Sequence, residues 1–128
     1  MNNNIVEQNT ILVPIPSEDY KHLFIVLTNP EGDPPVVVMV NITTRKPTSD
    51  STVVLTQGDH PFVHHESVIA FEHAGFFSVS RLENGLNNGK LKKYSDISDN
   101  LFSVIKQGLL ASPRTPQRVK NYCLERLQ

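Results

Sequence analysis

The chain has 128 residues, of which 38% are hydrophobic and 20% charged; these are the proportions of one globular domain with its own core, and they exclude a disordered protein. Its formal net charge of −1 lacks the clear basic excess of a protein dedicated to duplex DNA. No segment approaches the roughly 18–20 apolar residues of a membrane-spanning helix.

Five or six short segments in the first 82 residues have the β-branched or apolar composition of strands, with turn formers between them. They are residues 11–16, 23–27, 36–40, 52–56, 67–71 and 76–80. Residues 1–10 are polar and are expected to be loose, and residues 17–20 are expected to form a turn. The two prolines within residues 11–16 favour an edge strand or an extended arm at that place.

The central strand of the predicted sheet begins at Val36, and its residues 36–40 are all apolar. A strand with one solvated face would alternate apolar and polar residues, so we expect this strand to be covered on both faces. Its polar end, residues 41–45, is where it would reach the surface and expose side chains. Residues 52–56 are expected to be its partner strand.

After residue 90 the pattern changes to that of helices. Leu101 and Ile105 belong to a series of apolar residues at helical spacing. Ser98 is a suitable N-cap for this helix, and Asp99 in the first turn is favoured by the helix dipole. A second, shorter helix is expected after the Thr-Pro pair at residues 115–116.

These elements predict a single domain, residues 1–128, that is mainly β with C-terminal helices. A small barrel of five or six antiparallel strands would occupy about residues 11–82. A loop would follow at residues 83–89, and a helical part with two helices would occupy about residues 95–128.

Two features predict where the protein resides. The single cysteine, Cys123, cannot form an internal disulfide, which favours a reducing compartment. Residues 1–4 carry no basic patch before an apolar run, so they do not have the pattern of a secretory signal. We therefore expect a cytoplasmic protein without membrane association.

Three stretches of the chain resemble the MazF/PemK/Kid family of bacterial toxins. Residues 35–44, Pro-Val-Val-Val-Met-Val-Asn-Ile-Thr-Thr, are similar to the family's apolar strand that ends in Ile-Thr-Ser. Residues 67–73, Ser-Val-Ile-Ala-Phe-Glu-His, are similar to its Ser-Val-Val-Arg-x-Asp-Gln strand. Residues 79–110 resemble its final strand, Gly-x-Leu and helix. Pro34 and Ala70 stand where the family has arginines.

The resemblance implies a small SH3-like barrel followed by a helix. It also implies a toxin-like, metal-independent endoribonuclease of a toxin–antitoxin system, which acts on single-stranded RNA without a cofactor. Family members are usually homodimers, so the resemblance implies a homodimer and an antitoxin protein as a partner.

The candidate catalytic residues are Thr43, Arg45, Glu72 and His73. Cleavage of RNA by its own 2′-hydroxyl needs a base, an acid and a positive group beside the phosphate. Glu72 and His73 are an acid–base pair of suitable types, although neighbours in a strand face opposite sides and only one could line a given pocket. The planar fork of Arg45 suits phosphate oxygens, and Thr43 or Thr44 could donate a hydrogen bond to the same phosphate.

The histidines have three possible roles. Several residues of types that commonly bind metals lie close together in sequence: Asp59, His60, His64, His65, Glu66 and His73. Their spacing fits no standard zinc site, so no metal is predicted. Turn capping or stacking on Phe62 is a structural alternative. In the remaining interpretation, His64 or His65 contacts RNA by proton transfer or by stacking on a base.

Two other functions remain open at this stage. The barrel could be a non-catalytic binding module that holds a protein partner, such as an antitoxin-like peptide, in the same groove. It could also be a small metal-dependent hydrolase built on the histidines. The nuclease hypothesis expects Thr43, Arg45, Glu72 and one histidine to converge on one concave surface.

Overall fold

In a computed structural model of the chain, residues 4–14 and 21–127 are described, and they form seven strands, three α-helices and one 3₁₀ turn. The strands are β1 Thr10–Pro14, β2 Lys21–Val26, β3 Val36–Thr44, β4 Val54–Leu55, β5 Ser67–Ile69, β6 Gly75–Ser78 and β7 Lys92–Tyr94. The helices are α1 Val79–Asn87, α2 Asp99–Ala111 and α3 Gln117–Leu124, and the turn is η1 Phe71–His73. The turn expected at residues 17–20, and the end of the first expected strand, lie outside the described residues.

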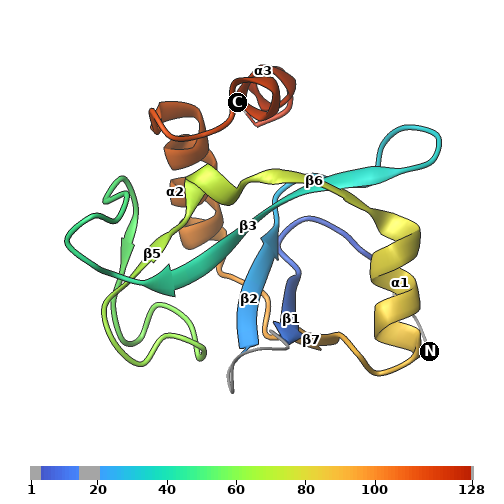
Figure 1. Cartoon of the computed structure of the whole chain (residues 1–128), viewed down its shortest axis with the longest axis horizontal. Helices are drawn as coiled ribbons and strands as arrows, with labels where there is room; N and C mark the ends of the chain where they lie inside the picture. Colours follow the sequence, from blue (N-terminus) through green and yellow to red (C-terminus); the bar gives the residue numbers. More distant parts are fainter. Residues whose placement is uncertain (1–3, 15–20, 128) are drawn as a thin grey trace.

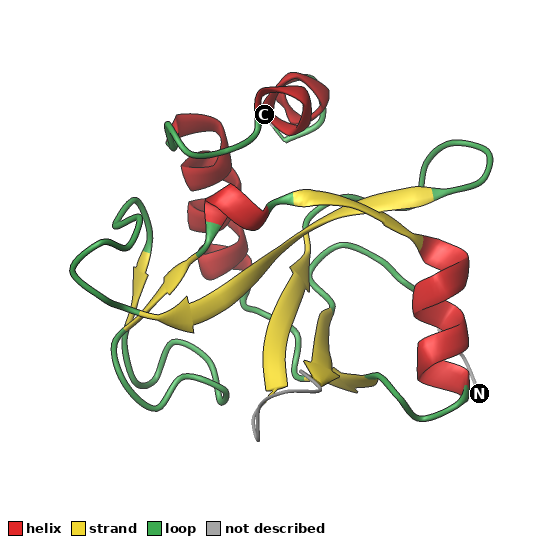
Figure 2. Ribbon diagram, in the orientation of Figure 1, coloured by secondary structure: helices red, strands yellow, loops and turns green. Residues whose placement is uncertain are grey.

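The described strands form one antiparallel sheet in the order β4-β5-β3-β2-β1-β7, with β6 also paired to β3. One edge of β3 pairs with β2. The other edge is shared, because residues 36–39 pair with β6 and residues 42–44 pair with β5. The sheet is strongly curved, with α2 and α3 on one side and α1 at the opposite end of the molecule (Figures 1 and 2). The mainly β, barrel-like fold with C-terminal helices that the sequence predicts is confirmed.

β3 is buried on both faces, as its unbroken apolar run predicts. Val38 and Ile42 pack on one face in a core that includes residues of α2. Val37 and Met39 pack on the other face in a second core that includes residues of α1. Each face of the strand therefore has its own apolar layer, and no polar alternation is needed until the strand leaves both cores.

The two C-terminal helices form where the sequence predicts them. The Ser98 side chain accepts a hydrogen bond from the amide of Leu101 at 3.1 Å, and Asp99 lies in the first turn of α2. Gly108 allows α2 to pack closely on Val53 and on Phe71 of η1, since a Cβ at that position would lie 2.5 Å from Cγ2 of Val53 and 2.9 Å from Cζ of Phe71. α3 begins directly after Pro116.

Helix α1 was not predicted: the sequence was expected to continue as a strand to residue 80 and then as a loop over residues 83–89. The side chain of Ser78 caps the helix instead, by accepting from the amide of Arg81. Val79 and Leu82 recur at helical spacing and cover the second core. Gly85 allows α1 to pack closely against Leu91, because a Cβ at this position would lie 2.5 Å from the Leu91 side chain.

Three further expectations about the sheet are wrong. The short β4 pairs with β5, which lies between it and β3, so residues 52–56 are not the partner of the central strand. β1 is an internal strand with β2 and β7 on its two sides, and its Pro14 lies at the strand end. Residues 1–10 were expected to be loose, but within the described residues 4–10 the chain is held in place, because Ile5 and Asn9 are buried.

The strand expected over residues 67–71 ends at Ile69, and the chain turns through η1. Phe71 is fully buried, and its burial against α2 fixes this turn. Glu72 and His73 are therefore exposed residues of a 3₁₀ turn and not neighbours in a strand.

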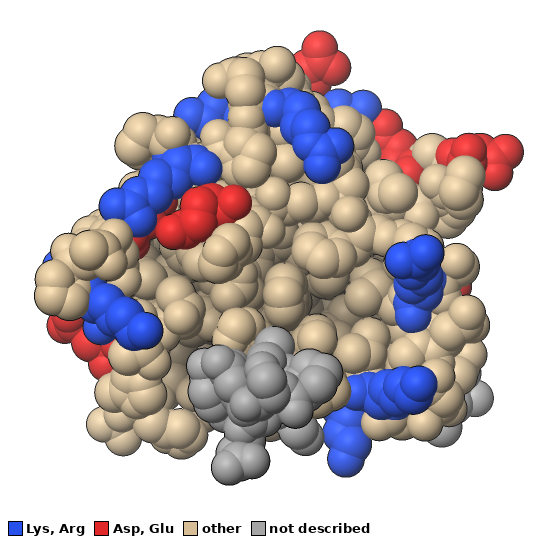
Figure 3. Space-filling view, viewed as in Figure 1, with Lys and Arg blue, Asp and Glu red and all other residues tan. Residues whose placement is uncertain are grey.

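The surface and the helices add two observations. On the face shown in Figure 3, most of the visible charged side chains lie toward the margin. In the described residues, no helix combines the length and the apolar character needed to cross a membrane.

Candidate functional site

A pocket of about 740 Å³ lies between one face of the sheet and the segment of residues 56–66, which joins β4 to β5. In Figure 1 this segment is the green loop at the lower left. The polar side chains that line the pocket are His22, Thr43, Thr44, Lys46, His64, His65 and Ser67. The apolar ones are Leu12, Ile42, Phe62 and Tyr94.

Strand pairing explains why Leu12 and Ile42, which line the pocket, share one face of the sheet. Leu12 pairs with Leu23, and Leu23 pairs with Ile42, so the three side chains point the same way. Ile42 is the last residue of β3 that pairs with β2, and Thr43 and Thr44 extend past that pairing. The polar end of β3 therefore becomes a wall of the pocket.

His65 is held at this wall by two contacts. Its Nε2 lies 2.9 Å from Oγ1 of Thr44, and which of the two groups donates depends on the tautomer of the ring. The hydroxyl of buried Ser67 donates to the main-chain oxygen of His65 at 2.9 Å. Imidazole can both accept and release a proton near neutral pH, so His65 can serve as an acid or a base in a fixed position.

His60 is buried and has a structural role. Its Nδ1 accepts a hydrogen bond from the amide of Phe62 at 3.1 Å, so Nε2 carries the proton and donates to the main-chain oxygen of Ser95 at 2.6 Å. The ring also lies against Tyr94, with a centroid distance of 5.7 Å. For His60 the turn-capping interpretation is confirmed. This histidine joins the segment 56–66 to the chain after β7.

The structure brings together four of the seven residues that the sequence singles out. Thr43, Thr44, His64 and His65 all line the pocket. Arg45 follows directly in sequence but does not line it, because its Nη1 pairs with Oε1 of Glu66 at 2.6 Å. Both side chains of this pair are at least 40% exposed, so the pair orients Arg45 without adding much stability.

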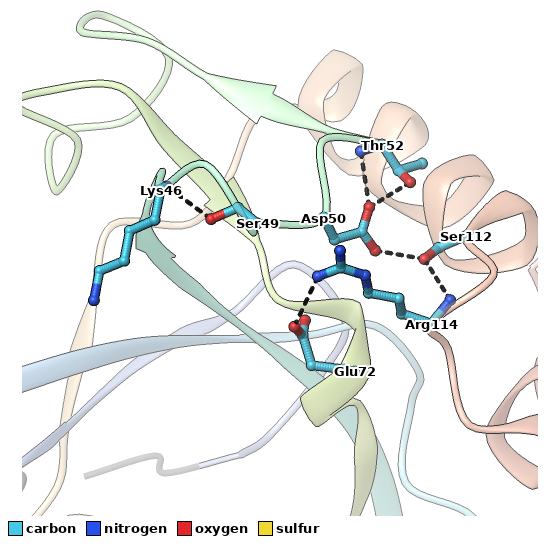
Figure 4. Close-up of polar contacts among 7 residues, drawn as sticks. All are labelled: Lys46, Ser49, Asp50, Thr52, Glu72, Ser112 and Arg114. Atoms are coloured by element: carbon cyan, nitrogen blue, oxygen red, sulfur yellow. Dashed lines mark hydrogen bonds and ion pairs between the residues drawn. The ribbon is translucent and has the colours of Figure 1, made fainter.

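Glu72 and His73 lie outside the pocket. Oε2 of Glu72 pairs with Nη1 of Arg114 at 3.5 Å, and Figure 4 shows these two side chains facing each other. The expected convergence of Thr43, Arg45, Glu72 and a histidine therefore does not occur, because η1 carries Glu72 toward the helices.

A buried carboxylate anchors the loop that carries Lys46. Asp50 is 5% exposed and accepts from the hydroxyl of Ser112 at 2.5 Å and from the amide and hydroxyl of Thr52 at 2.9 and 2.6 Å (Figure 4). Burial alone would raise the pKa of Asp50, but the hydrogen bonds from Ser112 and Thr52 outweigh it and lower the pKa below its ordinary value. The anchored loop leaves Lys46 extended away from Asp50, toward the pocket.

Sequence reasoning missed several of the pocket residues, among them His22, Lys46, Ser67 and Tyr94. Lys46 could have been suspected as the neighbour of Arg45. His22 and Tyr94 carry no local signal, because only the pairing of β2 with β3, β1 with β2 and β7 with β1 brings them near Thr43. Of the described residues that line the pocket, none is Asp or Glu, so the site has the positive character that an anionic ligand requires.

Comparison with models of known protein families gives no match for this chain, and a search among curated proteins gives none either. The class that the structure defines is therefore a small, mainly antiparallel β domain with C-terminal helices and a histidine-rich pocket. The resemblance to the MazF/PemK/Kid family stays a prediction that depends on the sequence stretches alone.

Proposed function

We propose that this protein is a divergent MazF-like toxin: a metal-independent endoribonuclease that cleaves single-stranded RNA in the pocket. The observation that carries the proposal is the make-up of that pocket. It combines three histidines, one lysine and a pair of threonines with apolar walls. Among the described residues that line it, none has a carboxylate side chain. These are the groups that RNA cleavage by the substrate's own 2′-hydroxyl requires.

In the proposed reaction, a base removes the proton of the 2′-hydroxyl while its oxygen attacks the adjacent phosphorus. The bond from phosphorus to the 5′-oxygen breaks, and an acid gives that oxygen a proton. We assign the base and the acid to His65 and His64, which line the same pocket, and the stabilisation of phosphorane charge to Lys46. Thr44 orients His65. The products are a 2′,3′-cyclic phosphate and a 5′-hydroxyl.

The proposed route uses protein side chains alone and requires no metal. Within residues 4–14 and 21–127, no three His, Cys, Asp or Glu side chains are grouped so that they could hold a metal ion. The metal-dependent hydrolase considered above has no ligand set in the described residues.

The experiment is to incubate purified protein with single-stranded and structured RNA in the presence of EDTA and to identify the ends of the products. We expect single-stranded RNA to be cut to 2′,3′-cyclic phosphate ends. His65→Ala should abolish cleavage, whereas His73→Ala, which removes an exposed histidine outside the pocket, should retain it. Absence of cleavage at stoichiometric enzyme would reject the proposal.

A non-catalytic binding module is the second candidate, and the apolar walls formed by Leu12, Phe62 and Tyr94 favour it. In that case the pocket would hold a peptide of an antitoxin-like partner. Peptide binding that is lost in Phe62→Ala, together with inactivity toward RNA, would support this function instead.

A further inference from the structure

We propose that an RNA strand runs across the pocket and is held on its far side by Lys92 of β7, so that the strand extends beyond the pocket on both sides. This inference deepens the proposed function and depends on it. It defines the substrate as a single strand that extends beyond the cleaved bond in both directions.

Strand register places Lys92 beside the pocket. Lys92 is directly opposite Leu12 in the pairing of β7 with β1, and Tyr94 is opposite Thr10. Residues two apart in a strand point to the same face, so Lys92 and Tyr94 project on the side of the sheet to which Leu12 points. Leu12 and Tyr94 line the pocket. Lys92 is exposed and continues this wall toward solvent.

Lys46 occupies the other side of the same pocket. It follows β3, whereas Lys92 belongs to β7, and β2 and β1 lie between these two strands. Three inter-strand steps separate β3 from β7, which is at most roughly 15 Å. Two cations on opposite sides of the pocket suit a backbone that carries one negative charge per nucleotide.

Basic side chains gather at this edge of the molecule. Lys90, Lys92 and Lys93 are all exposed, and in Figure 3 Lys and Arg side chains gather over β7 and the segment that joins it to α1. Lys93 points to the other face and donates to the main-chain oxygen of Asn4. Lys92 is therefore the residue assigned to the track.

Tyr94 gives the track a second kind of contact. Tyr94 is 41% exposed and lines the pocket, and its ring contacts the ring of His60. An exposed aromatic ring beside a cationic groove is a stacking platform for an unpaired base, and stacking tolerates any base. The combination with Lys92 selects single-stranded RNA over a small mononucleotide ligand.

Lysines on an edge strand have another use, which is to prevent pairing with a second sheet. The two roles differ in salt dependence. Binding that neutralises phosphates weakens with salt in proportion to the number of phosphates contacted, with a slope of about 0.7 per contact for single strands. Lysines that only protect the edge contribute nothing to this slope.

The test uses two RNAs, a dinucleotide that fills only the pocket and a dodecamer that extends beyond it. Each is prepared unmodified for cleavage assays and with 2′-O-methyl groups for binding without cleavage. Lys92→Gln is compared with Lys106→Gln, which removes the same charge from α2, where Lys106 lies over the ring of Phe102. Affinity for the methylated dodecamer is measured by fluorescence anisotropy over a range of salt concentrations.

We expect Lys92→Gln to lower the salt slope of dodecamer binding by about 0.7 and Lys106→Gln to leave it unchanged. Cleavage of the dinucleotide should be the same in both variants. Equal salt slopes in the two variants would overturn the track. If the wild type cleaves neither RNA but Lys92 still sets the salt slope, the nuclease proposal fails while the RNA track stands.

Discussion

The imidazole of His60 donates from Nε2 to the main-chain oxygen of Ser95 over 2.6 Å, and this bond joins the segment of residues 56–66 to the chain that follows β7. The segment carries His64 and His65, so one buried side chain fixes the positions of two others that line the pocket.

His60→Ala should lower the free energy of unfolding by about 1–3 kcal/mol, because it removes a buried imidazole together with its hydrogen bonds to Ser95 and Phe62. Urea unfolding measures this change. His73→Ala is the matched control, since His73 is exposed and should change stability little. Equal midpoints for the two variants would contradict the tie between the segment and β7.

Lys46→Ala should lower kcat on the order of 10²–10³-fold, because it removes the charge assigned to the phosphorane, while Lys46→Arg should retain most of the activity. Steady-state cleavage of a fluorescent RNA measures both. Glu72→Gln should leave the rate unchanged, since Glu72 pairs with Arg114 outside the pocket. A large rate loss in Glu72→Gln would instead restore the sequence-based assignment of the base.

Asp50 should make the protein sensitive to acid. Its pKa in the folded state is lowered, so its contribution to stability is present above the unfolded pKa of about 3.9 and is lost as the pH falls through the folded pKa. Asp50→Asn should lose about 1–3 kcal/mol at pH 7 and flatten the stability curve at acid pH. Urea midpoints across pH measure this, with exposed Glu125→Gln as the control. Parallel curves for wild type and Asp50→Asn would refute it.

Cys123 should be unreactive in the native protein. It is fully buried in the core, and burial raises the pKa of its thiol to about 11. At pH 8 almost no thiolate is then present, and reagents cannot reach the sulfur. A colorimetric thiol assay should find no reactive thiol until urea unfolds the chain. Rapid reaction of the native protein would show that α3 opens in solution.

The assembly is expected to be a homodimer, as the family resemblance implies. Val104 on α2 is 49% exposed and Leu124 on α3 is 40% exposed, so both helices present apolar side chains that a second copy could cover. Light scattering at micromolar concentration measures the mass. A clean monomer would count against the dimer, and Val104→Lys should dissociate a dimer that uses this face.

The parts of the fold that the sequence predicts are those with one dominant local pattern. The apolar run of β3 and the capped, periodic α2 are of this kind. Helix α1 was missed because Gly85 and the asparagines near it have the composition of a loop. Gly85 is needed because a larger residue would clash with Leu91, and the sequence does not show this contact. The pairing of β4 with β5 has no local signal either.

The candidate site divides in the same way. The polar end of β3 indicates Thr43 and Thr44, and the local density of histidines indicates His64 and His65. Glu72 was misplaced because the strand before it ends early, at Ile69, where Phe71 turns into the core. His22, Lys46 and Tyr94 come from elements far apart in sequence, and no spacing rule connects them.

The hydrogen bond between Asp50 and Ser112 joins residues 62 positions apart, and it ends at the last turn of α2. The loop that carries Lys46 is thus fastened to the helical layer. A truncation after Ala111 would delete α3 and would also remove Ser112, the partner that holds the loop of Lys46. The helical part therefore cannot be removed without a change in the pocket. A partner bound to α2 could therefore change the position of Lys46 through the bond between Ser112 and Asp50, without entering the pocket.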